Sequence, residues 1–536
     1  MKKLKLVCVA IAMACATPTL AGGLLTNTNQ HVAFDRMMSR EASIGIDGVY
    51  YNPAGVVFMS EGHHLAINWQ LAFQTRTINN DYALFTNNVN NPITPRDFKG
   101  TAFAPVIPSF QYAYNKGKWS FQASFALTGG GGKCTFDDGL GSFEKIVAET
   151  AIASCGLAGV VDQTLGNTLG QPGMEMFTSD QAFGKTGKYS FNSYMHGRQY
   201  YYGLSVGAAY KFCDNFSAFL GVRGVYALTN YYGYVENINV GNMPLYKVLD
   251  PTKESSANIE LSCDQSGVGF TPIIGVDYKT GRWNFSAKYE FKTRIRLKNK
   301  SVNQTPSIGN LPANLANQMT GILTAKFQQA GLPLEQAKQR AENTTNTVLN
   351  DPTVGATMMG LKTQFDQKLN KAIGEYEDGK KIAGDIPAYL ALGVGYSPVD
   401  AVRVNVGFHW FDDKNATSYN NRNKELKRGT LEYNAGVEVD VNKKITLSTG
   451  WQNTNYGLSD EYMDDKSFVV SSNSVAIGGV YHINKKMDLN VAYFHTFYQH
   501  KKTTETVQLT ADRSLNYSSD YTRNNNVFAV GLDINF

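Results

Sequence analysis

The feature that most constrains this chain is a period of two, which recurs from His63 to the C-terminus. In residues 431–441 every odd-numbered position is apolar and every even-numbered position is polar or Gly. Residues 403–410 and 444–452 show the same period. Successive side chains of a β-strand point to opposite faces, so each run predicts a strand with one apolar and one polar face. Runs of about 10 such residues can cross a membrane when their backbones pair in a closed barrel.

Fourteen such runs follow one another, and an even strand number is what a bacterial membrane barrel needs. Six tight turns alternate with seven longer connections, and outer-membrane barrels have this asymmetry, with the tight turns in the periplasm. The sequence therefore predicts an all-β fold, a 14-stranded antiparallel transmembrane β-barrel. The predicted strands are 63–78, 103–115, 118–128, 196–212, 214–232, 265–279, 282–299, 386–397, 400–412, 428–441, 443–456, 471–484, 487–500 and 523–536.

Composition excludes two other fold classes. A mean hydropathy of −0.29 is too polar for a bundle of membrane helices, and an aromatic content of 12% is too high for a disordered chain. A soluble β-sandwich also has alternating strands, but it would not need this turn–loop rhythm. Aromatic side chains on the apolar faces lie near strand ends, where membrane barrels carry girdles. The chain also ends on Phe536 in an alternating strand, which looks like the signal for outer-membrane barrel assembly machinery.

The first 21 residues have the pattern of a secretory signal peptide. Three lysines precede an apolar stretch, and small residues stand before Gly22. The apolar stretch, residues 6–16, is too short to span a bilayer. Cleavage before Cys15, as in a lipoprotein, is the alternative. The formal net charge of +5 includes these lysines, so no nucleic-acid partner is expected.

Residues 22–62 do not alternate, and they are too few for an independent domain. They hold Asn52, Pro53, Ala54 and Gly55 shortly before the first strand. With the leader, the strand count and the terminal Phe, this motif resembles the hatch of the FadL/TodX family. That family consists of outer-membrane channels for long-chain fatty acids and other hydrophobic compounds.

The resemblance implies an N-terminal hatch, residues 22–62, inside a barrel of residues 63–536. It implies a monomer in the outer membrane of a Gram-negative bacterium, in contact with lipopolysaccharide, with a hydrophobic small molecule as ligand and passive uptake as function. The family has a kink in its third strand that opens the wall. Four glycines that follow the third predicted strand are the expected place for it, namely Gly129, Gly130, Gly131 and Gly132.

Two long connections are expected on the extracellular side, residues 129–195 and 300–385. The second is helical in pattern, with apolar residues at helical spacing. One interpretation is a small helical cap whose apolar stripes pack on one another. The other is a hydrophobic landing surface for the ligand, as the resemblance implies, which would use Met319, Phe327, Met358 and Phe365.

Alternation also assigns side chains to the lumen. It places a cationic series in the seventh strand on the inner face, together with two further arginines. Two interpretations are open. The residues are ordinary polar lining that pairs with acids on other strands, or they hold the carboxylate of a ligand. The candidate head-group residues are Lys292, Arg294, Arg296, Arg223 and Arg403.

We expect no enzyme, metal or cofactor. None of the eight histidines precedes a serine in the H-x-S pattern of barrel lipases, and the cysteine spacing fits no zinc site. Cys134 and Cys155 share one predicted loop, so a disulfide between them is plausible. The alternative is that they are, with Cys213 and Cys263, four unrelated thiols, since the sequence does not give connectivity. The alternative function is a plugged porin-like channel or a receptor for haem or another small ligand. An adhesin or structural barrel is a third.

Overall fold

The computed structural model describes residues 24, 26–306, 308–510 and 513–536. The predicted signal peptide lies outside the described residues. Eighteen strands form one sheet. They are β1 Gly62–Tyr82, β2 Arg96–Lys116, β3 Trp119–Phe136, β4 Tyr189–Cys213, β5 Phe216–Val240, β6 Met243–Pro244, β7 Ile259–Thr280, β8 Trp283–Glu290, β9 Arg296–Gln304, β10 Lys381–Ala383, β11 Tyr389–Val399, β12 Val402–Phe411, β13 Leu431–Asn442, β14 Ile445–Asn455, β15 Ser472–Asn484, β16 Met487–Tyr498, β17 Lys501–Thr510 and β18 Arg513–Asn535.

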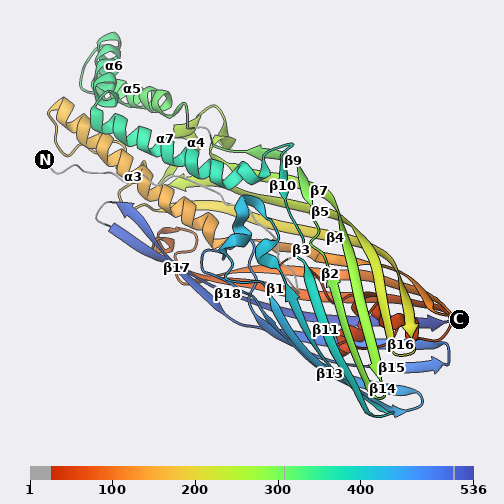
Figure 1. The fold of residues 1–536 in the computed structure, drawn as a ribbon. Coiled ribbons are helices and arrows are strands. Elements are labelled where there is room, and N and C mark those ends of the chain that lie inside the picture. Colours follow the sequence, from red (N-terminus) through yellow and green to blue (C-terminus); the bar gives the residue numbers. More distant parts are fainter. Residues whose placement is uncertain (1–23, 25, 307, 511–512) are drawn as a thin grey trace.

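These strands make a closed antiparallel barrel of fourteen wall strands, as predicted (Figure 1). Three wall strands are interrupted and consist of two segments each, namely β8 with β9, β10 with β11 and β16 with β17. The short strand β6 pairs with the end of β5 in a loop and is not part of the wall. The first and last strands close the barrel. β1 pairs with β18 in one unbroken register from His64 opposite Asn535 to Tyr82 opposite Tyr517.

The outer face of the barrel is apolar and the inner face is polar. Large apolar side chains point outward at high exposure, such as Leu204 at 58%, Leu220 at 69% and Phe270 at 67%. On the same strands the alternate positions are buried and often polar, such as Gln199 on β4 and Arg223 on β5. Such an exterior is stable against lipid rather than water. The barrel is therefore a transmembrane one.

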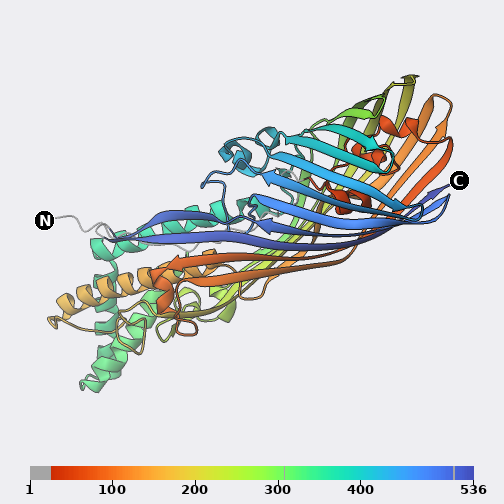
Figure 2. The ribbon, with the colours of Figure 1, turned by 90° about the horizontal axis from the view of Figure 1, so that it is seen from below.

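Helices gather at one end of the barrel, which we call the loop end, and the C-terminus lies at the other, the turn end (Figures 1 and 2). The helical connection expected between the seventh and eighth wall strands is confirmed. The helices of the loop end are α3 Gly141–Leu169, α4 Tyr246–Leu249, α5 Leu311–Gln329, α6 Leu334–Leu349 and α7 Pro352–Ile373. α3 is long and apolar enough to cross a membrane, yet 61% of its apolar window is buried in the protein.

Several wall strands are longer than predicted. β3 continues through the four glycines to Phe136, and β4 already begins at Tyr189. The expected loop 129–195 is therefore shorter than its predicted bounds at both ends. β5 likewise reaches Val240, and β7 begins at Ile259. These additions lie toward the loop end, where strands leave the apolar band and the alternation that marked them fades.

Residues 26–58 lie inside the barrel at the turn end, where Figure 2 shows them as red coils behind the wall strands. They form α1 Val32–Met37, α2 Gly48–Tyr51 and the 3-10 turn η1 Gly55–Phe58. Nearly all of these side chains are buried against inward-facing residues of the wall. We call this segment the hatch.

Candidate functional site

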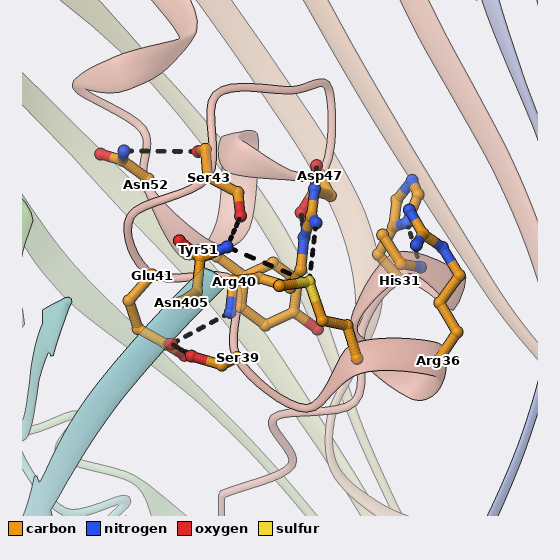
Figure 3. A network of polar contacts seen from close by, with 12 residues as sticks. His31, Arg36, Ser39, Arg40, Glu41, Ser43, Asp47, Tyr51, Asn52 and Asn405 are labelled. Carbon is orange, nitrogen blue, oxygen red and sulfur yellow. Dashed lines mark hydrogen bonds and ion pairs between the residues drawn. The ribbon is translucent and has the colours of Figure 1, made fainter. Parts of the chain in front are cut away.

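Ion pairs hold the hatch to the wall. Glu438 on β13 accepts from two hatch arginines, Arg36 and Arg40, with Arg40 Nη1 at 3.0 Å. Arg40 Nε also lies 2.7 Å from Asp47 Oδ2 within the hatch, as Figure 3 shows. Burial raises the pKa of the Asp47 carboxyl, but the charge and hydrogen bonds of Arg40 lower it together with His31, and the net pKa is below the usual value. Both partners of each pair are therefore charged.

A second contact joins the hatch to the wall through a histidine. His409 Nε2 on β12 lies 2.7 Å from Glu41 Oε1 of the hatch, and its Nδ1 lies 2.8 Å from Glu432 Oε2 on β13. All three side chains are fully buried. An imidazole between two carboxylates is most stable when it is protonated, so this contact is also an ionic one.

The Asn-Pro-Ala-Gly motif forms a turn that bonds to three wall strands. Asn52 Nδ2 donates to Asp277 Oδ2 on β7 at 2.5 Å, and its Oδ1 accepts from Gly55 N at 3.1 Å. Gln122 on β3 donates to Pro53 O at 2.7 Å. Ser217 on β5 donates to Ala54 O, also at 2.7 Å. A Cβ on Gly55 would lie 2.4 Å from Asn52 Nδ2, so the turn requires glycine there.

The wall has a gap between β2 and β3. Pairing runs from Lys116 to Ser109 on β2, stops, and resumes at Ala102 opposite Cys134. Six residues of β2, 103–108, and seven of β3, 127–133, face each other without ladder pairs. The β2 side holds Pro105 and Pro108, which have no N–H to donate, and the β3 side holds the four glycines. β2 thus lacks N–H donors at its prolines, and the glycine run of β3 weakens regular strand pairing.

The start of the hatch fills part of this gap from within. Asn27 N donates to Thr128 O at 2.9 Å, and Asn27 Nδ2 donates to Leu127 O at 3.2 Å. Both carbonyls belong to the unpaired stretch of β3. The hatch therefore satisfies backbone groups that β2 leaves free.

A cavity of about 560 Å³ occupies the lumen at the loop end, above the hatch. It is bounded by wall strands, by the start of α3, by the segments before and after β10, by the connections after β12 and β14, and by Leu24. Its lining combines aromatic and aliphatic side chains with cations and acids. Representative lining residues are Tyr201, Tyr231, Leu297, Lys145, Arg422 and Lys466. We call it the mouth cavity.

The predicted inward series of cations is wrong from Arg294 onward. The β7–β8 ladder ends at Ile273 opposite Glu290, and β9 resumes at Ser266 opposite Lys298. Residues 291–297 thus face only residues 267–272, so one extra residue reverses the faces. Arg294 and Arg296 are consequently exposed, and Ile295 is buried.

The other predicted head-group cations face inward but have partners in the protein. Arg223 holds Glu290 with two hydrogen bonds, of 2.6 and 3.0 Å. Arg403 holds Asp440 in the same way, at 2.7 and 2.6 Å. Lys292 donates to a backbone carbonyl at 3.1 Å. This arrangement is the paired polar lining that the sequence left open as the alternative.

The expected landing surface is mostly internal to the helical cap. Met319 is fully buried and Met358 is 9% exposed, so neither presents itself to a ligand. Phe327 is half-buried, with Arg340 Cζ 4.7 Å from its ring centre. The Phe365 side chain lies outside the described residues. An apolar cavity of about 90 Å³ lies between α3, α4 and α5, bordered by Val161, Val248 and Leu315.

The four described cysteines are free thiols, so the disulfide considered for Cys134 and Cys155 is not formed. Cys134 lies in β3, whereas Cys155 lies in α3. The shared loop on which the pairing was based does not exist, because β3 extends past Cys134.

Sequence analysis missed a pair of inward-facing arginines. Arg76 on β1 and Arg523 on β18 are both buried and face the lumen. They are direct partners in the β1–β18 register. The strand predictions 63–78 and 523–536 contain both residues, but their neighbourhood depends on the closing register, which a single strand does not reveal.

Comparison with solved structures places this architecture. The crystal structure of a Pseudomonas aeruginosa FadL homologue aligns over 96% of this chain and 100% of that chain, with a TM-score of 0.58 and 14% identity. The chain has the FadL fold. A TodX deltaS2S3 mutant, described as a monoaromatic hydrocarbon channel, aligns over 94% of this chain and 99% of its own, with a TM-score of 0.50 and 14% identity. No protein-family model and no curated protein matches the chain. The resemblance is confirmed for the fold.

Proposed function

We propose that this protein is an outer-membrane channel through which hydrophobic compounds enter the cell by diffusion. The gap between β2 and β3 carries this proposal. It lies in the lipid-facing wall, next to the exposed Phe73 and Phe103, whose rings stack at 4.7 Å. An apolar solute that leaves through such a gap moves into the bilayer and never has to pass the hatch.

The route begins at the mouth cavity. Its volume of about 560 Å³ falls in the range of small-molecule sites, and its walls combine apolar and polar groups. From there the lumen is closed toward the turn end by the ion-paired hatch. The gap is then the direct way out of the lumen, with the hatch residue Asn27 bonded across its inner side.

We infer that the ligand is a hydrophobic compound and, most specifically, a long-chain fatty acid. The aromatic and aliphatic walls of the mouth cavity, such as Tyr201, Tyr231 and Leu297, suit the apolar chain of such an acid. The FadL homologue and the hydrocarbon channel share the fold, which supports the broader class. We further propose that the leader directs export and that the last strand directs insertion by the barrel assembly machinery.

A cross-link across the gap tests the route. A Cβ on Gly132 would lie 3.6 Å from the Cβ of Ala104, within the range that a disulfide requires. The variant A104C/G132C, in a C134S background, should form this bond and prevent the gap from widening. Uptake of a labelled fatty acid by cells that carry only this channel should fall on oxidation and recover on reduction.

The single variants A104C and G132C, also in C134S, control for the new thiols and for the oxidant. Uptake that is equally fast with and without the cross-link would exclude exit through the wall. Uptake of small hydrophilic solutes at a comparable rate would favour the porin-like alternative.

A further inference from the structure

Two arginines face each other inside the barrel beside the wall gap. Arg523 is 7% exposed and Arg76 is 9% exposed, and the two are cross-strand partners. Directly opposed residues of antiparallel strands have Cα atoms about 4.5–5.5 Å apart, so their side chains share one region of the lumen. Gln74, two residues before Arg76, is paired with Ala102, the β2 residue at which the gap begins.

Arg523 has no acidic partner among the residues that the structure describes. Its Nε is buried and makes no hydrogen bond. On its other side it faces an aromatic ring, with Cζ 5.0 Å from the ring centre of Tyr498 on β16. By contrast, Arg223 and Arg403, which also face the lumen, are each bonded to a carboxylate, and Arg76 donates from Nε to Gln74 Oε1 at 3.1 Å.

Such an arrangement is unfavourable without an anion. A buried guanidinium loses hydration, and a second cation directly across the strand adds repulsion. A ring face offers only a weak attraction by comparison with a carboxylate. The described residues around Arg523 supply no anion, so a ligand that carries one would stabilise this arginine.

The site lies between two hollows of the lumen. Six residues toward the loop end on β18, Tyr517 lines the mouth cavity. Two residues toward the turn end, Asn525 lines a cavity of about 40 Å³ whose wall also includes Tyr498 and, from the hatch, Phe34 and Met38. A ligand that descends along β18 from the mouth cavity would meet Arg523 before it reached the hatch.

We propose that Arg523, with Arg76 beside it, is an anion site that binds the carboxylate of an organic acid at the gap. The planar guanidinium of Arg523 donates to a carboxylate oxygen through the Nε–H that now lacks a partner. The apolar remainder of the acid then lies toward the gap. This inference rests on the proposed function, and it adds that the channel distinguishes acids from neutral compounds at its exit.

The test compares acids with their alcohols on the purified full chain. Binding of octanoate, octanol, benzoate and benzyl alcohol is measured by calorimetry in non-ionic detergent at pH 8, with detergent alone subtracted. The variants are R523Q, R523K and, as a control at an exposed turn position, R282Q. Heat-modifiable migration on gels verifies that each barrel is folded.

R523Q should weaken binding of the acid about tenfold or more and leave that of its alcohol within about twofold. R523K keeps the charge and should retain part of the affinity for the acid, and R282Q should bind like the wild type. The octanoate and benzoate arms show whether aliphatic or aromatic acids occupy the site. Dependence on Arg523 for benzoate alone would keep the site but refute the fatty-acid part of the proposed function.

An equal loss for acid and alcohol in R523Q, or no loss for either, would overturn the anion site and leave the channel proposal standing. A wild-type protein that binds none of the four compounds would contradict the proposed function itself, and the anion site with it.

Discussion

Replacement of Glu438 by Gln should release the hatch. The Glu438 carboxylate is 5% exposed and is shared by Arg36 and Arg40 of the hatch and Arg403 of the wall. In the variant Arg40 keeps Asp47, whereas among the described residues Arg36 keeps two neutral partners, Asn490 at 3.2 Å and Ser448 at 3.0 Å. Removal of one member of a buried ion pair costs about 3–5 kcal/mol, which multiplies the undocked population roughly a hundred- to several-thousand-fold.

The measurement is single-channel conductance in a planar bilayer. The wild-type hatch should keep the pore closed to ions, and E438Q should show frequent large openings. E438D, which keeps the charge, should lie between the two. D400N removes a carboxylate that is 98% exposed at a turn and should behave like the wild type. If E438Q and the wild type had the same open probability, the hatch would not be held by these ion pairs.

Three further predictions concern the loop end and the thiols. Burial, opposed by Lys466, raises the pKa of Glu375 to about 7. The free energy of unfolding relative to E375Q, measured with denaturant, should therefore fall as the pH rises from about 4.5 to about 7 and stay constant above that. A difference that does not depend on pH would contradict this. In the folded protein a maleimide should label the exposed Cys213 quickly and Cys263 only after denaturation, as mass spectrometry can show. M319S should destabilise the cap by about 2–5 kcal/mol, whereas M359S, at a 72% exposed position, should leave melting unchanged.

The barrel itself could be predicted because its signal is local. Each wall strand carries its own alternation, since lipid lies on one side and a polar lumen on the other. All fourteen predicted strands overlap the observed ones. Strand ends were less accurate. β5 ends at Val240 rather than at 232, because residues 233–240 mix apolar and polar side chains without a regular alternation of lipid-facing residues.

The faces of the seventh strand could not be predicted from one strand alone. Pro272 on β7 stands where Phe291 would need a backbone donor, and the ladder stops at this point. The extra residue that follows reverses inside and outside for Arg294 and Arg296. The information is in the neighbouring strand, about 20 residues earlier in the chain.

The cavities and the arginine pair depend on contacts between distant parts of the chain. The mouth cavity needs Leu24, α3 and three loops to meet, and Arg76 meets Arg523 only when the barrel closes. Alternation gives the inward face of each residue but not its neighbours across the lumen. Sequence reasoning therefore found the barrel fold but neither the mouth cavity nor the arginine pair.

The seam between β1 and β18 has a consequence for biogenesis. It joins His64 to Asn535, residues 471 positions apart, and the hatch precedes it in sequence yet ends up enclosed by it. The barrel cannot close until β18 pairs with β1, and the hatch must lie inside the barrel when it closes. Closing so long a loop is entropically slow. We expect the polypeptide to travel across the periplasm in an unfolded, chaperone-held form, with its final strand deciding when folding becomes irreversible.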